Sequence, residues 1–356
     1  MLGFSMYLNR DFTADDYNYL LAMRNAGLTT VFTSLHIPED DQKVVLKRLA
    51  ELTKWCQNLE TDIIADVSKE GLEQLGIALD NEKQIKSLGL TGLRIDDGVS
   101  SATIAKLSQK MPIALNASTI NKDDITALRE HGASFENLQA WHNFYPRPET
   151  GLDANWLAQK NKWLHQMNLE TMAFVAGDDI LRGPIHAGLP TLEKHRGENP
   201  LAATLELKQL GCDHVFIGDG SLTTNMIDCF KNYIKQQTIT LHVDENLPEL
   251  FNYEWSNRPD VARDVIRLTE GRSRQLFNTE PQTKVSSRPK GTITCDNKLY
   301  LRYQGELQIT KRDLPADKKV NVLGRVVPQD LPLLNQIGAG QKIHFVELKK
   351  DQGLFV

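Results

Sequence analysis

The sequence lacks the features that mark several large classes of protein. Its four cysteines (Cys56, Cys212, Cys229 and Cys295) form no C-x-x-C pair, so we expect neither a disulfide framework nor a cysteine-based zinc site. No His-x-His or His-Glu-x-x-His pair occurs, and the sequence predicts neither a metal nor a cofactor. No apolar run reaches the length of a membrane span, and residues 1–8 lack the basic residues of a signal peptide. We therefore expect a cytoplasmic protein that does not bind a membrane.

A strong charge of either sign is also missing. The formal net charge is -5, which argues against a generally basic nucleic-acid binder. With 356 residues, of which 40% are hydrophobic and 24% charged, the chain has an ordinary globular composition. That length is enough for one large core and one small core.

The first two-thirds of the chain alternate between short apolar runs and longer helical patterns. Such alternation predicts parallel strands joined by helical crossovers, because each parallel pair needs one. We predict an α/β fold, a (β/α)8 TIM barrel over residues 1–237, as the catalytic domain. A doubly wound open sheet is the alternative, but a Gly-rich turn after the first strand is missing. The predicted strands cover residues 2–8, 28–35, 62–67, 92–96, 112–116, 138–144, 171–175 and 214–218.

The pattern changes after residue 237. Short alternating runs separated by turn residues predict a small all-β domain, a compact barrel or sandwich, over residues 238–356. One helix is expected at residues 258–269. The stretch between residues 284 and 325 is locally basic, which suits a solvated face, an anion-binding patch or the interface of a homodimer. The predicted strands cover residues 238–243, 291–294, 299–303, 307–310, 319–327 and 342–347.

In a (β/α)8 barrel the working residues lie at the carboxyl ends of the strands and in the loops that follow. Carboxylates and amides there suit the hydroxyl groups of a sugar, and arginines suit phosphate or carboxylate. The loops after strands seven and eight are the expected phosphate site of this fold. The candidate substrate-binding residues at these positions are Asn9, Ser34, His36, Arg94, Asn116, His142, Asn143, Tyr145, Arg147, Arg182, Glu193, Gly218 and Asp219.

Several of these residues also have structural explanations. Asp66 suits a helix cap, and Asp96 lies in a turn before Gly98. Glu149 lies beside Arg147, where a structural salt bridge is an alternative. His142 fits a packed position in the barrel wall. Asn199, followed by proline, is typical of a helix N-cap.

Six segments resemble the 6-phospho-N-acetylmuramidase family of glycosidases, in consistent order over essentially the whole chain. The longest, residues 142–151, reads HNFYPRPETG. The others are residues 33–40 (TSLHIPED), 115–119 (LNAST), 182–184 (RGP), 188–196 (GLPTLEKHR) and 300–309 (YLRYQGELQI). Two local departures are residues 175–177 (VAG), at the end of strand seven, and Asp97.

The resemblance implies a (β/α)8 barrel followed by a cyclophilin-like β domain. It also implies a cytoplasmic hydrolase in cell-wall recycling that splits N-acetylmuramic acid 6-phosphate from N-acetylglucosamine. The partner is then a small phosphorylated disaccharide. Its two anionic groups account for the arginines, and Arg302 and Glu306 of the second domain are further candidate contacts.

Glycoside hydrolysis normally needs two carboxyl groups. We predict Glu149 as the acid, and Asp96 or Asp66 as the base, nucleophile or orienting group for the substrate's own acetamide. Two other functions stay open. An aldolase or isomerase of phosphosugars would need a strand-end lysine or a metal, and a non-catalytic sugar-phosphate-binding protein would tolerate loss of both carboxylates.

Overall fold

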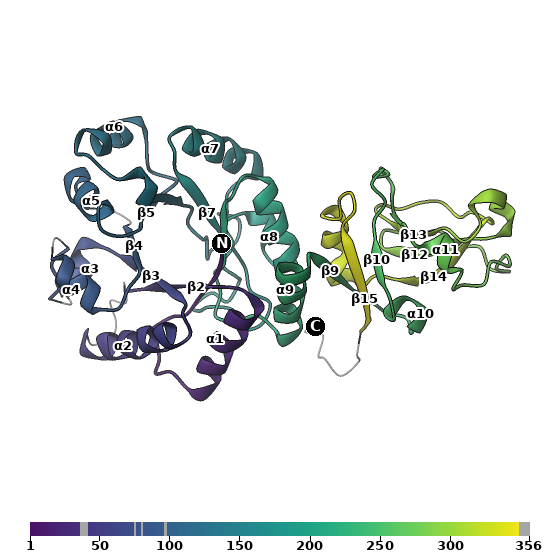
Figure 1. Cartoon of the computed structure of the whole chain (residues 1–356), viewed down its shortest axis with the longest axis horizontal. Coiled ribbons are helices and arrows are strands. Elements are labelled where there is room, and N and C mark those ends of the chain that lie inside the picture. The colour runs from purple at the N-terminus through teal and green to yellow at the C-terminus, as the bar shows by residue number, and fades with distance from the viewer. Residues whose placement is uncertain (36–41, 75, 80, 96–97, 349–356) are drawn as a thin grey trace. The chain divides into compact units, whose positions relative to one another are not determined.

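The computed structural model describes residues 1–35, 42–74, 76–79, 81–95 and 98–348 (Figure 1). The chain forms two compact units, Met1–Ile227 and Asp228–Val356. The predicted division after residue 237 falls between the end of helix α9 and the start of strand β9, and it stays a prediction. Among the described residues, no helix has the length and apolar character that a membrane span needs.

The first unit is a closed barrel of eight parallel strands that follow one another in chain order, which confirms the predicted fold class. Figure 1 shows the helices on the outside of the strand ring. The strands are β1 (Leu2–Ser5), β2 (Thr30–Ser34), β3 (Asp62–Val67), β4 (Gly92–Ile95), β5 (Ile113–Asn116), β6 (Leu138–Trp141), β7 (Glu170–Val175) and β8 (His214–Ile217).

The helices of this unit begin where the sequence supplies capping groups. Asn199 accepts hydrogen bonds from the amides of Leu201 and Ala202 ahead of α8, and Thr13 and Asp16 form the capping box of α1. The helices are α1 (Ala14–Ala26), α2 (Gln42–Asn58), α3 (Lys69–Gln74), α4 (Glu82–Ser87), α5 (Ser101–Ser108), α6 (Lys122–Glu130), α7 (Ala154–Gln166) and α8 (Pro200–Gln209), with short 3-10 turns η1 (Phe135–Asn137) and η2 (Glu193–His195). Helix α9 (Thr224–Gln236) begins in this unit and continues into the second.

The barrel interior is filled with side chains. An eight-stranded barrel is only wide enough for its own side chains, so polar groups are confined to its ends. Tyr7 and Phe144 pack against the interior cluster. The cluster consists of Phe32, Ile64, Ala114, Trp141, Met172, Phe174 and Phe216.

The second unit contains two sheets, in the orders β10-β15-β9 and β11-β13-β12-β14, which confirms a small β-rich domain. Its likeness to cyclophilins stays a prediction. The strands are β9 (Thr238–Val243), β10 (Glu254–Ser256), β11 (Val265–Leu268), β12 (Thr292–Asp296), β13 (Leu307–Thr310), β14 (Val320–Arg325) and β15 (Lys342–Glu347), with short helices α10 (Pro248–Phe251) and α11 (Gly271–Arg274) and 3-10 turns η3 (Lys298–Tyr303) and η4 (Pro328–Asn335).

Two predicted elements of this unit are wrong. The helix expected at residues 258–269 is replaced by β11, in which Ile266 and Leu268 are buried, whereas Val265 and Arg267 are only half-buried. That period of two fits a strand paired with β13. The strand expected at residues 299–303 is the turn η3, which Asn297 caps by accepting a hydrogen bond from the amide of Leu299.

Candidate active site

A chain of polar side chains links three strands at the carboxyl end of the barrel. Arg94, at the end of β4, is buried and donates from Nη1 to Asp66 Oδ1 of β3 at 2.5 Å. Its Nη2 donates to the side-chain oxygen of Asn143, two residues beyond β6. The structure therefore brings three predicted site residues into one hydrogen-bonded group.

The strand register places further predicted residues on the same side. Ser34 of β2 pairs with Asp66, and Asp66 pairs with Arg94. Because alternate residues of a strand face the same side, Ser34 shares the interior face with Phe32 of the core cluster. By the same reasoning Asn116, two residues after Ala114, faces inward at the end of β5, where it is buried.

Arg182 forms the second polar feature of the barrel mouth. Its guanidinium carbon lies 3.5 Å from the ring centroid of Tyr7, a cation–π contact. The hydroxyl of Tyr7 donates to the carbonyl oxygen of Gly218 at 2.5 Å. Burial holds the pKa of Tyr7 above its usual value, and the nearby Arg182 offsets only part of that rise. Among the described residues no carboxylate forms an ion pair with Arg182.

Glu149 lies in the loop after β6 with an unusual backbone. Its φ is 73°, in the left-handed region that residues with side chains rarely adopt, and such strain concentrates at functional sites. Its amide donates to Glu193 Oε1 at 2.8 Å, and the amide of Gly151 donates to Glu193 Oε2 at 2.8 Å. The side chain of Glu149 is exposed, and within the described part of the chain no group bonds its carboxylate.

Arg196 holds Glu193 in place. Its Nε and Nη2 each donate to one Glu193 oxygen at 2.7 Å, a bidentate ion pair. The same guanidinium donates to the carbonyl oxygens of Tyr145 and Gly188, which joins the loops after β6 and β7. Hydrogen bonds from Arg196 lower the pKa of Glu193 to about 2. Glu193 therefore supports the loop that carries Glu149.

The acidic residues after β7 and β8 are engaged by the loops themselves. The carboxylate of Asp219 is fully buried and accepts hydrogen bonds from the amides of Gly177, Arg182 and Leu189, each at 2.9 Å. Asp178 accepts from both the amide and the hydroxyl of Thr223 at 2.8 Å, and burial raises the pKa of Asp178.

Main-chain and hydroxyl groups of these loops, the predicted phosphate site, are also occupied by bonds within the protein. The amide of Gly220 donates to the carbonyl of Ile180, and the hydroxyl of Ser221 donates to Asp179. The amide of Gly218 donates to the carbonyl of Val175. The loops after β7 and β8 thus place Arg182 beside Tyr7, and their main-chain amides form the hydrogen bonds that hold the loops in this conformation.

The remaining predicted residues of the barrel lie elsewhere. His142 is fully buried on the outer side of β6, where its Nε2 lies 2.8 Å from Asn161 Oδ1 of α7, and burial lowers its pKa to about 4. Asn9 and Arg147 are exposed, and Tyr145 donates its amide to the carbonyl of Pro190. His36 and Asp96 lie outside the described residues.

The two predicted residues of the second unit have partners within that unit. Glu306 forms a bidentate ion pair with Arg267, at 2.6 Å and 3.1 Å. Arg302 is exposed and donates to the hydroxyl of Tyr303.

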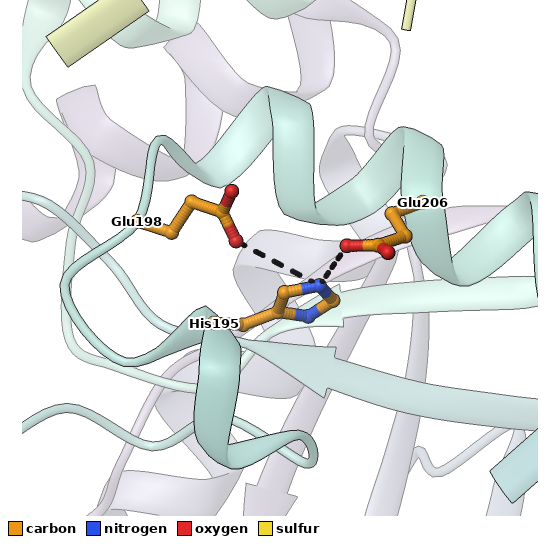
Figure 2. A group of neighbouring side chains, drawn as sticks. All are labelled: His195, Glu198 and Glu206. Atoms are coloured by element: carbon orange, nitrogen blue, oxygen red, sulfur yellow. Dashed lines mark hydrogen bonds and ion pairs between the residues drawn. The ribbon is translucent and has the colours of Figure 1, made fainter. Parts of the chain in front are cut away.

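One cluster has the composition of a metal site. His195, Glu198 and Glu206 offer ligand atoms within 4.8 Å of one another (Figure 2). His195 Nε2 lies 2.9 Å from Glu206 Oε2, while the ammonium of Lys194 lies 2.5 Å from Glu206 Oε1. Because these two groups already bond Glu206, we assign the cluster a structural role in joining η2 to α8.

Sequence reasoning assigned no role to two residues that organise the site. Arg196 stands three residues after Glu193, an ion-pair spacing on a helical turn that could have indicated the pair. Tyr7 stands two residues after Ser5, on the side of the strand that faces the interior cluster, but nothing in its position indicates the contact with Arg182.

Comparison with known proteins identifies the family. The model of the N-terminal part of the 6-phospho-N-acetylmuramidases matches residues 2–232, and the model of their C-terminal part matches residues 235–346. The chain belongs to the 6-phospho-N-acetylmuramidase family. It is therefore a glycosidase, as the resemblance implied.

Solved structures share the fold over nearly the whole chain. A conserved Enterococcus faecalis protein of unknown function is 39% identical, with a TM-score of 0.90, over 98% of this chain and 96% of that one. An uncharacterized B. cereus protein is 23% identical, with a TM-score of 0.75, over 97% of this chain and 99% of that one, and shows the fold alone. No curated protein matches the chain.

Proposed function

We propose that this chain hydrolyses the glycosidic bond between N-acetylmuramic acid 6-phosphate and N-acetylglucosamine, in the cytoplasm, as a step in cell-wall recycling. The observation that carries the proposal is the contrast between two carboxylates of the barrel mouth. Asp66 is ion-paired with Arg94, whereas Glu149 is exposed and bonded by no described group. Glycoside hydrolysis needs such a difference, because one carboxyl group must donate a proton and the other must act as an anion.

In this mechanism Glu149 donates its proton to the leaving glycosidic oxygen. Glu193 and Arg196 fix the backbone that presents it, since the Glu149 amide is bonded to Glu193. Asp66 acts as base, nucleophile or partner of the substrate's acetamido group, and Asp96 is the alternative for that role. Arg94, which also donates to Asn143, holds the Asp66 carboxylate in one orientation.

Arg182 is the proposed receptor for the 6-phosphate. A guanidinium presents several donors in one plane and suits phosphate oxygens. Its main-chain amide is fixed by Asp219 and its guanidinium by Tyr7, so both ends of the residue are held before substrate binds. Ser34 and Asn116 are the proposed hydrogen-bonding partners of the sugar hydroxyls.

An aldolase mechanism through a Schiff base lacks its nucleophile. The last residues of the eight strands are Ser5, Ser34, Val67, Ile95, Asn116, Trp141, Val175 and Ile217, none of which is lysine. This observation favours hydrolysis over the alternative of a Schiff-base aldolase of phosphosugars.

The test is hydrolysis of the phosphorylated disaccharide by wild type and Glu149→Gln, with the unphosphorylated disaccharide alongside. We expect cleavage that depends on the phosphate, and a loss of kcat of about a hundredfold or more in the variant, the usual effect of removing a general acid. Glu136→Gln, at an exposed glutamate of η1, is the matched control.

A second substrate separates an acid from a structural residue. An activated aryl glycoside of N-acetylmuramic acid 6-phosphate needs little protonation of its leaving group, so Glu149→Gln should retain much of its activity on it. Equal losses on both substrates would reject Glu149 as the acid. Binding without cleavage by wild type would favour a non-catalytic sugar-phosphate-binding protein.

A further inference from the structure

One sheet of the second unit has an apolar face and a polar face. Across β11, β13 and β12, Ile266 pairs with Ile309 and Ile309 pairs with Ile293, and all three are fully buried. The next residues, Arg267, Gln308 and Thr294, also pair across the sheet. Because alternate residues face opposite sides, these polar residues share the other face.

Two carboxyl groups belong to that polar face. Asp296 lies two residues after Thr294, and Glu306 lies two residues before Gln308. Both are strongly buried, with exposed fractions of 6% and 4%. Buried carboxylates are normally paired or hydrogen-bonded, so a buried carboxyl group without a partner in the protein is a candidate for binding a ligand.

The two carboxyl groups differ in their partners. Glu306 is bonded at both oxygens by Arg267, and Gln308 Nε2 donates to it at 3.2 Å. Asp296 bonds through its main chain to Glu306 and Gly305, but within the described residues no group donates to its carboxyl oxygens. The carboxyl oxygens of Asp296 are not fully enclosed by the protein, so they reach the molecular surface.

The chemistry of Asp296 favours a neutral ligand rich in hydroxyl or N–H groups. Burial, and then the charge of Glu306, raises the pKa of Asp296 to about 7. Near neutral pH this carboxyl group is therefore present in both forms, one that donates a hydrogen bond and one that only accepts. Sugar hydroxyl groups can complete either arrangement, whereas an anion would be repelled by the ionised form of Asp296 itself.

A metal ion is a poorer fit at this face. Among the described residues, the group of His, Cys, Asp or Glu side chains with converging ligand atoms is that of His195, Glu198 and Glu206 in the other unit. Asp296 and Glu306 are not part of such a group, and Arg267 already neutralises Glu306.

We propose that this polar face is a saccharide-binding site, in which Asp296 exchanges hydrogen bonds with the hydroxyl and acetamido N–H groups of an N-acetylated amino sugar. The choice of sugar rests on the proposed function, since both halves of that substrate are N-acetylated amino sugars. The site itself rests on the unpartnered carboxyl group and the polar face around it.

The turn that follows Asp296 supports a site at this edge. Leu301 of η3 has a φ of 53° and is 78% exposed. A branched apolar residue held in a left-handed conformation and presented to solvent stores strain that function commonly explains. Tyr303, also exposed, offers an aromatic ring of the kind that stacks on the apolar face of a sugar.

The experiment titrates the full-length protein, with methyl-labelled valine, with N-acetylglucosamine and follows the methyl resonances by NMR. Val320 pairs with Asp296 and Val322 pairs with Thr294, so their methyl groups report on this face. We expect saturable shifts at both valines in wild type and in Glu149→Gln. In Asp296→Leu the affinity should fall about tenfold or more, because a ligand hydrogen bond to a carboxyl group is lost.

The controls separate binding from folding and from hydrolysis. Replacing an unpartnered carboxyl group by leucine removes a buried polar group, so the melting temperature of Asp296→Leu should not fall. Asp296→Asn, which keeps one acceptor oxygen, should bind with intermediate affinity, and Glu249→Gln on α10 should bind like wild type. No shift at Val320 and Val322, or equal affinity in Asp296→Leu, would overturn the proposal. Because the probe is not cleaved, this outcome is independent of whether the disaccharide is hydrolysed.

Discussion

The two halves of the barrel mouth use the same residue types for different purposes. At the ends of β3 and β4 and just beyond β6, Arg94 donates to both Asp66 and Asn143 across the barrel end. After β7 and β8, Asp178 accepts from Thr223 of the loop after β8, and Asp219 accepts from main-chain amides of the loop after β7, so each carboxylate ties one loop to the other. A carboxylate at a strand end is therefore recognised as chemical or structural by its partners and not by its position.

The difference follows from the lengths of the loops. The segment between β7 and η2 runs from residue 176 to residue 192 without a helix or strand, so its main-chain amides need other partners. Asp219 supplies acceptors for three of them. The loop that positions Arg182 is thus organised by a carboxylate that we do not expect to touch substrate.

The largest effect is expected for Asp66, in the half of the barrel mouth formed by β3, β4 and β6. In Asp66→Asn the amide oxygen still accepts from Arg94, but the anion is lost, and we expect kcat/KM for the phosphorylated disaccharide to fall about a thousandfold. Asp178→Asn, the matched carboxylate of the other half, should lose stability and keep most of its kcat. Steady-state kinetics and thermal melting of both variants check this, and similar kcat losses would remove the distinction between the halves.

Substitutions in the half formed by the loops after β7 and β8 should change the free energy of unfolding. Asp219→Asn turns one acceptor oxygen into a donor that faces a main-chain N–H, so we expect the free energy of unfolding to fall by about 3 kcal/mol. The exposed Asp228 of α9 provides the control, since Asp228→Asn should change the free energy by no more than about 0.5 kcal/mol. Urea denaturation measures both. An unchanged midpoint for Asp219→Asn would mean that the loop does not depend on this carboxylate.

The end of β6 extends the comparison to the two sides of the barrel wall. Trp141 belongs to the interior cluster, whereas the next residue, His142, faces α7. Burial lowers the pKa of His142 from 6.5 to about 4. Between these values the unfolded chain binds a proton that the folded protein does not, so the folded state loses stability as the pH falls from 6.5 toward 4.

This loss should amount to about 3 kcal/mol, and it should be absent in His142→Gln, whose side chain does not titrate. Urea denaturation at pH 6.5 and pH 4 measures the difference between wild type and the variant, which removes the contribution of the other groups. An equal pH dependence of the two proteins would show that His142 is protonated in the folded state.

Periodicity in the sequence was enough to predict the barrel, because eight alternations of apolar runs and helical patterns admit few other folds. It could also place Asp66 and Arg94 at strand ends. It could not predict that they pair, since this depends on the register of β3 against β4. The three amides that donate to Asp219 could not be predicted either, because only the folded loop brings them together.

The second unit shows where local patterns mislead. Residues 258–269 carry alternating charged and apolar residues that fit a helix as well as a strand, and pairing with β13 decides for the strand. Glu306 was a candidate contact because it lies in a motif of the family, but its carboxylate is already paired with Arg267. The carboxyl group without a described partner is that of Asp296, which lies outside the motif.

The smallest expected effect concerns the choice of arginine for the phosphate. Arg182 and Arg147 both lie in loops at the barrel mouth, and the main chain of each is hydrogen-bonded, but of the two only the guanidinium of Arg182 packs on an aromatic ring. In Arg182→Gln we expect KM for the phosphorylated disaccharide to rise about tenfold or more, as charge-assisted hydrogen bonds are lost, while activity on the unphosphorylated disaccharide stays the same. Arg147→Gln should leave the preference for phosphate intact. If Arg147→Gln abolishes that preference and Arg182→Gln does not, the phosphate lies at the β6 loop, and the contact between Arg182 and Tyr7 serves the fold alone.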